Sequence, residues 1–324
     1  MTALHEPCAG PALALAGALR RAALLGRTRK LVCAEIADTA SPAVYVGEGE
    51  SLPWLALVHG GQPRKICAFP LRGLSRLAAP PDNSLCVEVN RLLGPLLPTG
   101  GFGTLPWVRQ VIDLESPCHR SRVPSLEGTF GRKVRKFGFR YDVAVDQKAV
   151  DEYYHGLYFP YVTWRFGALA HPRSLAQLRA ATRRGFVLRV FQEEHWVAAA
   201  VCRRRRDTVT VVAFGLREPF EERLRQGALS AVYYWLLRWA RDHRVRHVDL
   251  LRSRPHTRDG VYHHKSRFGA EAIFDPWPHA GLWFFPPGDA PLSAASVDFL
   301  VRGDGGGLVS LRQAWERAAQ RARH

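Results

Sequence analysis

Lysine is scarce in this sequence. Of its 324 residues, 46 are lysine or arginine and 29 are aspartate or glutamate, which gives a net charge of +17 with histidine neutral. Six of the cations are lysines and the remaining 40 are arginines. The positive excess favours a polyanionic partner, such as nucleic acid, an anionic membrane surface or a phosphate-rich cofactor. The arginine bias is equally typical of GC-rich coding spread over the whole surface, so both interpretations stay open.

Cysteine is also infrequent and irregularly spaced. The six cysteines form no CxxC pair, as expected of reduced thiols that are buried individually. This pattern indicates a cytoplasmic setting. The residues are Cys8, Cys33, Cys67, Cys86, Cys118 and Cys202.

Long apolar runs are missing, and no uncharged stretch reaches the roughly 20 residues that a membrane-spanning helix needs. The apolar stretch 11–19 has no basic segment before it and runs directly into Arg20 and Arg21. We therefore expect no membrane span. Apolar residues at helical spacing predict a helix over 12–25 that packs on the protein, and a membrane-surface anchor is the alternative.

The composition is that of a globular chain. Hydrophobic residues make up 47% of the sequence and charged residues 23%, which excludes a disordered, collagen-like or disulfide-stapled chain. At about 100 to 200 residues per domain, the length predicts two domains or two fused lobes.

In the first third of the chain the pattern favours strands. We expect a strand over 31–36, a hairpin with arms 54–59 and 65–71, and a weaker strand over 85–89. The segment 131–140, GRKVRKFGFR, then holds five cations on a possible helix. It is either a solvated helix with one packed stripe or a helix that contacts phosphates.

Residues 150–275 have the most regular pattern. Three β-rich runs separated by polar turns predict an antiparallel meander, and apolar residues at i, i+3, i+4, i+7 and i+8 predict a following amphipathic helix. The RRRR turn of the meander is either a nucleic-acid patch or a solvated guard of a hairpin edge. The expected elements are an aromatic helix over 150–161 that Pro160 distorts or ends, a helix over 174–184, strands over 186–191, 196–202 and 208–214, a helix over 229–240, a strand over 245–251, a short helix over 261–268 that Gly269 stops, a strand over 272–274, a linker from Pro286 and a basic helix over 309–321.

Two short motifs give this order of elements a family resemblance. HVDLLRS, residues 247–253, is followed by GVYHHKSRFGAE, residues 260–271. The pair resembles the carboxyl-terminal signature of the FemAB-like and BioF2-like acyltransferases, which belong to the GNAT (Gcn5-related N-acetyltransferase) superfamily. In that signature a strand ends in an Asp and an Arg-Ser pair and precedes a Gly, a Lys and a Phe-Gly. The sequence departs from it at Leu251, where the family commonly has glycine, and at His264, where it has a hydrophobic or aromatic residue.

The resemblance covers roughly half of the chain and implies a mixed α/β (α+β) fold of the GNAT-like acyl-CoA N-acyltransferase type, with two tandem lobes. We accordingly expect a degenerate GNAT-like lobe over 1–125, a FemAB/BioF2-like lobe over 126–285, and a linker with a basic helix over 286–324. The hairpin expected at 54–71 would be an internal echo of that at 187–203.

The activity implied by the resemblance is formation of an amide from an amine and an activated acyl group. Such a site needs a proton acceptor for the amine and hydrogen-bond donors for the tetrahedral oxyanion, but no serine or cysteine nucleophile. The sequence accordingly has no GxSxG motif and no ordered Ser-His-Asp triad.

By resemblance, Lys265 neutralises charge that develops near the transferred acyl group, although a solvated helix lysine would fit the position as well. Asp249 either acts as a base, orients a neighbour or is a structural carboxylate. His264, with His256 and His263 near it, is the candidate base near neutral pH. Since His263 and His264 cannot share a helical face, we expect no metal site.

The remaining site residues follow from the same resemblance. Arg252, Ser253, Phe268 and Gly269 belong to the signature and are predicted to contact the substrate. A coenzyme A donor would place its pyrophosphate at the start of the helix after the meander. The predicted donor-binding residues are Arg223, Arg225, Gly227, Arg132 and Lys133.

These features predict a cytoplasmic enzyme that transfers an acyl or aminoacyl group directly to the amine of a sugar, an amino acid or a peptide-like metabolite. We expect no permanently bound cofactor. The donor is a thioester such as acyl-CoA or acyl carrier protein, or alternatively aminoacyl-tRNA. A GNAT-like module without catalytic activity that binds nucleic acid or another polyanion through its arginines is the second alternative.

Overall fold

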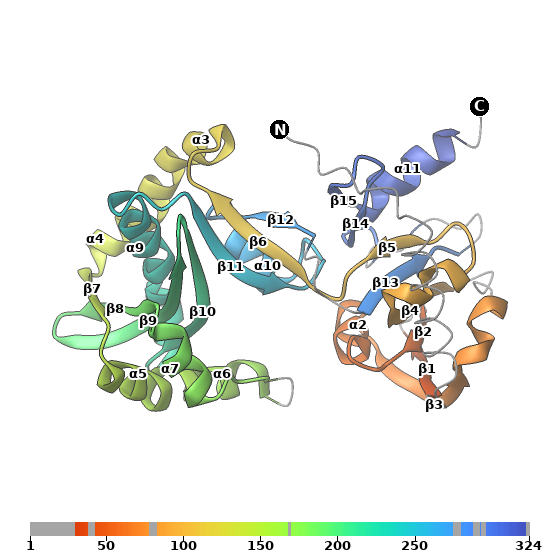
Figure 1. Ribbon diagram of the computed structural model, residues 1–324, viewed down its shortest axis with the longest axis horizontal. Helices are drawn as coiled ribbons and strands as arrows, with labels where there is room; N and C mark the ends of the chain where they lie inside the picture. Colours follow the sequence, from red (N-terminus) through yellow and green to blue (C-terminus); the bar gives the residue numbers. More distant parts are fainter. Residues whose placement is uncertain are drawn as a thin grey trace. The chain divides into compact units, whose positions relative to one another are not determined.

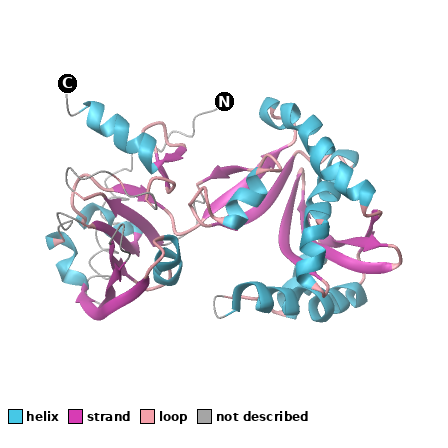
Figure 2. Cartoon of the chain, turned by 180° about the vertical axis from the view of Figure 1, so that it is seen from behind, coloured by secondary structure: helices cyan, strands magenta, loops and turns pink. Residues whose placement is uncertain are grey.

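The structure of the protein is a computed structural model, and it describes residues 30–37, 43–77, 83–167, 170–274, 280–287, 292 and 296–321. The chain forms two compact units. Unit 1 consists of Met1–Val108, Arg254–Asp259 and Phe274–His324, and unit 2 of Arg109–Ser253 and Gly260–Ile273. The mixed α/β class predicted from the sequence is confirmed, because each unit combines a sheet with helices (Figures 1 and 2).

Unit 1 is built on a six-stranded sheet with the strand order β3-β1-β2-β4-β13-β5. The pair β2 and β4 is parallel, whereas the other neighbours are antiparallel. Its elements are β1 (Lys30–Ala37), β2 (Ala43–Gly47), α2 (Leu52–Val58), β3 (Gln62–Pro70), η1 (Leu71–Arg76), β4 (Ser84–Asn90), η2 (Arg91–Leu96), β5 (Phe102–Thr104), β13 (Ala280–Phe285), β14 (Leu300–Arg302), β15 (Leu308–Ser310) and α11 (Leu311–Arg321).

Both faces of the unit 1 sheet are covered, because successive side chains of a strand point to opposite faces. In β4, Cys86 packs with α2 and α11 in one cluster, while Leu85 and Val87 pack with η1 and η2 in another. This explains why β4 is buried at every position from Ser84 to Val89, including the carboxylate Glu88, instead of alternating between buried and exposed residues.

Unit 2 contains a seven-stranded sheet with the order β12-β6-β11-β10-β9-β8-β7. β10 and β11 run parallel in it. Its elements are β6 (Val108–Asp113), α3 (Pro117–Leu126), η3 (Glu127–Gly131), α4 (Arg132–Lys136), β7 (Phe139–Ala144), α5 (Gln147–Tyr153), η4 (Tyr154–Tyr158), α6 (Phe159–Phe166), α7 (Leu175–Thr182), β8 (Gly185–Gln192), β9 (His195–Arg205), β10 (Thr208–Leu216), α8 (Phe220–Gln226), α9 (Ala228–Asp242), β11 (His247–Ser253), α10 (Gly260–Ser266) and β12 (Glu271–Ile273).

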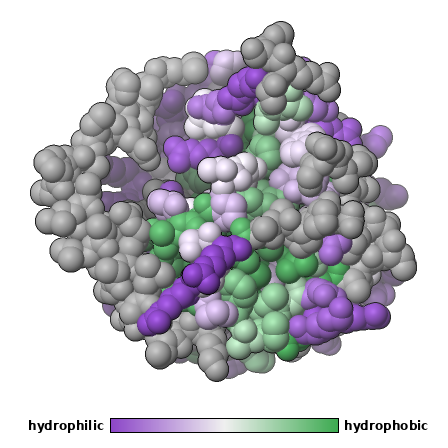
Figure 3. All heavy atoms as spheres, turned by 90° about the vertical axis from the view of Figure 1, so that its right-hand side faces the viewer, coloured by the Kyte–Doolittle hydropathy of each residue, from purple (hydrophilic) through white to green (hydrophobic). Residues whose placement is uncertain are grey.

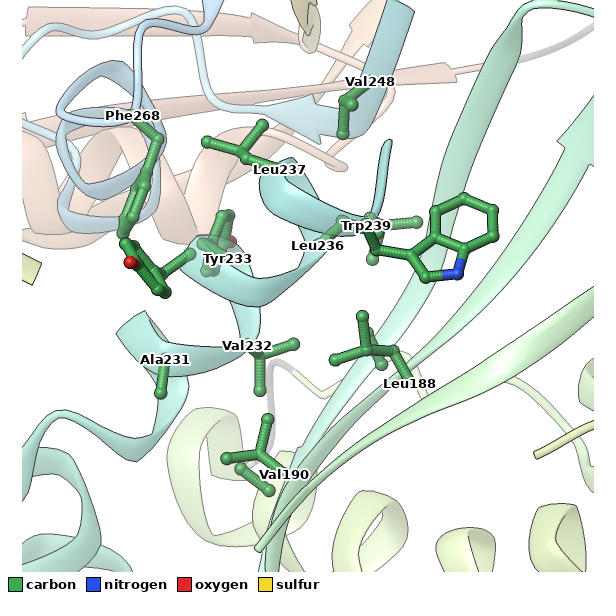
Figure 4. Packing of buried hydrophobic residues seen from close by; sticks show 14 of the residues in the cluster. Leu188, Val190, Ala231, Val232, Tyr233, Leu236, Leu237, Trp239, Val248 and Phe268 are labelled. Carbon is green, nitrogen blue, oxygen red and sulfur yellow. The ribbon is translucent and has the colours of Figure 1, made fainter. Parts of the chain in front are cut away.

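Helix α9 is the centre of the unit 2 core. Its apolar side chains pack on one face of the sheet, and Figure 4 shows Val232 directed towards Leu188 and Val190 of β8. The opposite face is covered by α5, η4 and α7, which pack on Val187, the β8 residue before Leu188. The helices on each side of the sheet therefore bury their apolar stripes against β8, whose successive side chains point to opposite faces.

The meander, the amphipathic helix, the next strand and the short helix are confirmed in the predicted order. β8, β9 and β10 form antiparallel pairs, α9 follows them, and β11 and α10 come next. The predicted stop at Gly269 also fits, since its φ of +87° lies in the left-handed region that favours glycine. The strand Leu85–Val89 and the strand Leu31–Ile36 correspond to β4 and β1.

The hairpin predicted at 54–71 is wrong in its first arm. Residues Leu52–Val58 form helix α2, with Pro53 in its first turn, and bury Leu52, Trp54 and Leu55. A short apolar run can be a strand or a buried helix, and the packing of this one in the unit 1 core decides for the helix. The second arm exists as β3, but it pairs with β1. The proposed echo of the hairpin at 187–203 is therefore absent.

The structure divides the chain at other places than the predicted boundaries 125 and 285. β6 begins at Val108 and belongs to the sheet of unit 2, while β13 returns to pair with β4 and β5 of unit 1. The predicted linker after Pro286 is also different, because β14 and β15 pair with each other and Phe299, Val301 and Leu311 enter the unit 1 core.

Two predicted helices have unexpected forms. In the segment 131–140, α4 is short and β7 already begins at Phe139. The aromatic helix does not end at Pro160 but is distorted before it, as one of the two predicted outcomes: α5 continues through the π-helical turn η4 into α6, which contains Pro160. The helix predicted over 12–25 lies outside the described residues.

The described cysteines are not all buried individually. Cys86 and Cys202 are buried, but Cys67 and Cys118 are exposed. Cys33 and Cys67 are partners across β1 and β3. The expectation that each thiol is isolated and buried is therefore wrong for these residues.

Within the described residues, no helix is long and apolar enough to cross a membrane. Figure 3 shows one face of the molecule, on which apolar side chains gather in a central area among hydrophilic ones. Apolar atoms are a normal part of protein surfaces, so this face by itself indicates no function.

Candidate functional site

The two parallel strands at the middle of the unit 2 sheet separate from each other. β10 and β11 pair only over Thr208–Thr210 and His247–Asp249, after which the two strands diverge (Figure 1). The register of β10 with β9 shifts between Val211 and Ala213, directly after the last pair with β11. A bulge of this kind bends a strand and redirects its backbone groups. Beyond Thr210, the edge of β10 that faces β11 has no strand partner among the described residues.

Asp249 lies at the point where the strands separate. Its side chain is 1% exposed, and Oδ2 accepts hydrogen bonds from Arg109 of β6 and, at 3.2 Å, from Thr210 Oγ1. Oδ1 accepts a hydrogen bond of 2.9 Å from the Leu251 N–H. The carboxylate thus connects β6, β10 and β11, and of the predicted roles this contact set fits the orienting one best.

Leu251 has a left-handed backbone. Its φ is +59°, which costs a branched residue about 1–2 kcal/mol relative to the right-handed region. The hydrogen bond from its N–H to Asp249 holds this conformation. The sequence therefore has leucine at a position whose geometry favours glycine, the residue that the resembling family commonly has there.

Lys265 is buried at the end of β11. It projects from α10, its side chain is 4% exposed, and Nζ donates hydrogen bonds of 2.8 Å to the Arg252 carbonyl and 3.1 Å to Ser253 Oγ. Ser253 Oγ donates in turn to Gln110 Oε1 of β6 at 2.7 Å. A buried ammonium group is tolerated where such partners satisfy it. The alternative of a solvated helix lysine is therefore wrong.

His264 lies beside an aromatic stack. Tyr233 of α9 stacks on Phe214 of β10, with ring centroids 4.5 Å apart, and on Phe268 at 4.8 Å. The His264 ring meets Tyr233 edge-on at 5.0 Å. Its Nε2 is buried with no hydrogen-bond partner among the described residues. Burial, reinforced by Arg267, lowers the pKa of His264 to about 4, so that the ring is neutral at pH 7.

The other signature residues are not equally placed for substrate contact. Phe268 is fully buried and also stacks on Phe130 at 4.2 Å, so it is a core residue. Gly269 is buried too, and a Cβ placed there would lie 3.1 Å from His119 Nδ1. Ser253 is buried in the network of Lys265, whereas the Arg252 side chain is exposed.

Two of the predicted donor-binding residues come together at the start of α9. Gly227 has φ +90° and joins α8 to α9. A Cβ placed on Gly227 would lie 3.3 Å from Lys133 Cδ. Lys133 and Arg132 are exposed on α4, and Lys133 lies near the first-turn N–H groups of the 15-residue helix α9. Helix N-termini attract anions.

Arg223 is placed differently from Arg225. Its guanidinium donates hydrogen bonds to Gln192 and Gln226, so it connects α8 to β8. Arg225 is exposed in the last turn of α8. The structure thus favours Lys133 and Arg225 over Arg223 as contacts for an anionic donor.

Sequence reasoning missed the residues that β6 contributes. Arg109 and Gln110 hold Asp249 and Ser253, and Gln110 Nε2 also donates to the Tyr262 carbonyl and to Ser266 Oγ. Burial alternates along VRQVID, Val108–Asp113, but the apolar residues do not, because one of the buried positions is Gln110, so the sequence carried no clear strand signal at this place. Within the described residues, no group of three or more His, Cys, Asp or Glu side chains could hold a metal ion.

No protein-family model and no curated protein sequence matches the chain. Solved structures are similar to it at low identity. L-PGS from Bacillus licheniformis is 10% identical over 82% of this chain and 86% of its own, with a TM-score of 0.38. FemX is 9% identical over 80% and 85%, with a TM-score of 0.38. A GNAT-family protein from Novosphingobium aromaticivorans is 16% identical over 68% and 81%, with a TM-score of 0.33. Since these TM-scores lie below 0.5, the proposal of function rests on the residues of this chain.

Proposed function

We propose that the protein is an N-acyltransferase that moves an acyl group from a thioester such as acyl-CoA directly to an amine. The observation that carries this proposal is the separation of β10 from β11, with the bulge at Val211–Ala213 next to it. An unpaired strand edge offers backbone N–H groups without a side-chain nucleophile. Amide formation by direct attack needs such donors to stabilise the oxyanion.

In the proposed reaction the amine nitrogen attacks the carbonyl carbon of the thioester. The carbonyl oxygen becomes an oxyanion, which accepts hydrogen bonds from N–H groups of β10. The C–S bond then breaks, the thiolate leaves, and the nitrogen loses a proton. His264 is the proposed acceptor of that proton, because its ring is neutral at pH 7 and Nε2 has no partner among the described residues. Lys265 and Asp249 position the end of β11.

The donor is proposed to bind at the start of α9. The pyrophosphate of coenzyme A carries the negative charge that the first-turn N–H groups, Lys133 and Arg225 would attract. Gly227 supports this use, since a side chain there would meet Lys133.

An aminoacyl-tRNA donor is the second candidate, and the exposed cations of α4 favour it. Arg132, Lys133, Arg135 and Lys136 are exposed within five residues beside the same helix terminus. A tRNA donor requires contacts with several phosphates, so its affinity would fall steeply with salt.

The test measures binding and transfer with the whole chain. Calorimetry with acetyl-CoA and with bulk tRNA is followed by mass spectrometry of glucosamine, an amino acid and a dipeptide after incubation with each donor. We expect acetyl-CoA to bind and its acyl group to appear on an amine. A Lys133→Gln variant should raise the KM for the donor at least fivefold, while the matched variant Lys148→Gln, at an exposed lysine of α5, should not change it.

Transfer that RNase abolishes and that acetyl-CoA does not support would instead establish the tRNA donor. Binding of tRNA without transfer to any amine would contradict both candidates and favour a binding module without catalytic activity.

A further inference from the structure

Unit 2 has a hollow at the carboxyl end of α9. It has a volume of about 620 Å³ and lies among the end of β7, the start of β8, the β9–β10 hairpin and the carboxyl end of α9. Since α9 has 15 residues, its two ends are about 20 Å apart at 1.5 Å per residue. The proposed donor site at the start of α9 and this hollow are therefore different places.

The hollow is shallow and largely open to solvent, and its wall is mainly apolar. Val143 and Val145 line it with exposed fractions of 37% and 69%, while Phe186 and Trp239, which also line it, are buried. Two neighbouring aliphatic side chains with this exposure are unusual in a surface region that is otherwise strongly charged. They offer contact to an aliphatic chain.

Three arginines, Arg184, Arg204 and Arg206, form the rim of the hollow. None of the three forms an ion pair with a carboxylate of the described residues, in contrast to Arg189 and Arg179 nearby in the sequence, which do. Arg204 also donates a hydrogen bond of 3.2 Å to the His243 carbonyl, which fixes its guanidinium 5.9 Å from the Trp239 ring.

Three of the four acidic side chains next to the hollow in sequence have other partners, while the fourth, Asp242 beside His243, is exposed and adds one negative charge at this end of α9. Asp142 is bound by Arg189, Asp146 caps α5 through the Ala149 N–H, and Asp207 contacts His247 and Thr208. The carboxyl end of α9 carries a partial negative charge that opposes an anion. His243 Nδ1 lies 2.8 Å from the Trp239 carbonyl, and the Val245 N–H donates to Ala240, so these carbonyls are already bonded. The three rim arginines therefore outnumber the one acidic side chain, Asp242, that no hydrogen bond or ion pair of the described residues holds, and the local charge is positive.

Stacking of a nucleobase fits this hollow poorly. Trp239 is 6% exposed and is covered by His243 at 4.2 Å and Phe186 at 4.2 Å between ring centroids. Single-stranded nucleic acid binds through exposed aromatic faces together with cations, and the rings that line this hollow offer no such face.

From these observations we infer that the hollow binds an anionic amphiphile, with an aliphatic chain against Val143 and Val145 and a carboxylate or phosphate head held by Arg184, Arg204 and Arg206. Guanidinium groups pair with both kinds of head through two parallel hydrogen bonds. This site assigns a role to the RRRR turn that differs from both roles predicted from the sequence. It does not depend on the proposed transferase activity.

The test is calorimetry with the whole chain and with probes below their micelle concentrations. Decanoate and decyl phosphate carry chain and charge, decanamide carries the chain alone, and acetate and inorganic phosphate carry the charge alone. We expect both charged ten-carbon probes to bind at least tenfold more tightly than the other three. A stronger response to one of the two head groups identifies the preferred anion.

Variants then locate the binding. The triple change Arg184→Gln, Arg204→Gln and Arg206→Gln, and separately Val145→Asp, should each weaken binding of decyl phosphate at least tenfold. All four positions are exposed, and the one hydrogen bond of these side chains that is lost, from Arg204 to the His243 carbonyl, is also exposed, so circular dichroism should stay as in the wild type and the unfolding midpoint close to it. The matched control Arg120→Gln, an exposed arginine of α3, should change the affinity less than twofold.

Three results would overturn the inference. They are equal binding of decanamide and decanoate, equal binding of inorganic phosphate and decyl phosphate, and an Arg120→Gln effect as large as that of the triple variant. Binding of bulk tRNA that needs the three arginines, with no binding of the ten-carbon probes, would assign the surface to nucleic acid and also contradict it.

Discussion

Asn in place of Asp249 tests the carboxylate at the separation of β10 and β11. The change keeps the shape of the side chain but removes its charge and one of its two acceptor oxygens. Three donors point at this carboxylate, from Arg109, Thr210 and the Leu251 N–H. At least one of them would meet an NH2 group in the Asp249→Asn variant.

The expected cost follows from the burial of the pair. Removing one partner of a fully buried ion pair costs about 3–5 kcal/mol, because the other charge is left without compensation. Asp249 is 1% exposed, but the Arg109 side chain is 33% exposed, so water can partly compensate its charge. We therefore expect a loss of about 2–3 kcal/mol in the free energy of unfolding.

A matched control exists in the same sheet. Asp142 accepts two hydrogen bonds of 2.6 Å from Arg189 across β7 and β8, but its side chain is 47% exposed. Exposed pairs contribute about 0–1 kcal/mol, so Asp142→Asn should cost less than about 1 kcal/mol. Urea unfolding of both variants at pH 7.5, followed by tryptophan fluorescence and circular dichroism, measures the difference. Equal losses in the two variants would refute the assignment of Asp249 as the group that joins the three strands.

Three further predictions concern the neighbourhood of this carboxylate. Lys265→Met leaves Ser253 and the Arg252 carbonyl without their ammonium donor, so it should lower the free energy of unfolding by about 2–4 kcal/mol and the rate of acyl transfer at least a hundredfold. Lys148→Met should change neither quantity, and an unchanged transfer rate in Lys265→Met would remove Lys265 from the site. Leu251→Gly should be more stable than Leu251→Ala by about 1 kcal/mol in urea unfolding, since only glycine relieves the positive φ, and the reverse order would contradict the strain. The pKa of His264 lies near 4 in the folded chain and near 6.5 when unfolded, so the folded chain favours the neutral ring. The contribution of His264 to stability is therefore complete above pH 6.5 and lost as the pH falls from 6.5 to 4. A His264→Phe variant should lose less stability over this range than the wild type.

The parts of the fold that the sequence predicted correctly have strong local periodicity. In α9 the apolar residues recur at helical spacing over 15 residues, and the meander strands are separated by short polar turns. These patterns fix both the type of element and its partner, because consecutive strands of a meander pair with each other. The order β8, β9, β10, α9 and β11 therefore followed from local signals alone.

Unit 1 was harder to predict because its pairing is not local. α2 has seven residues, too few for helical periodicity to separate it from a buried strand. β13 pairs with β4 over a separation of almost 200 residues, and the sequence carries no signal for that distance. The boundary predicted at 285 consequently cut away a segment whose last strands and helix complete the unit 1 core.

The sequence pointed to only some of the residues of the candidate site, and those residues all hold the end of β11. Asp249, Ser253 and Lys265 were found because they stand in a recognisable motif, and each of them bonds backbone or a neighbouring polar side chain near the end of β11. They hold the strand in place. The partners that complete this arrangement, Arg109 and Gln110, come from a strand about 140 residues earlier and carry no motif.

The groups proposed to stabilise the oxyanion are still less visible in a sequence, because they are backbone N–H groups of β10, which every residue except proline has. These N–H groups differ from others in two ways: β10 has no pair with β11 after Thr210, and its register with β9 shifts directly afterwards. In β11 itself, the left-handed Leu251 with its bond to Asp249 interrupts the extended backbone two residues after the last pair with β10. Side chains that shape the backbone thus leave a motif, whereas the backbone groups that would act on a substrate can be located only once the pairing of the strands is known.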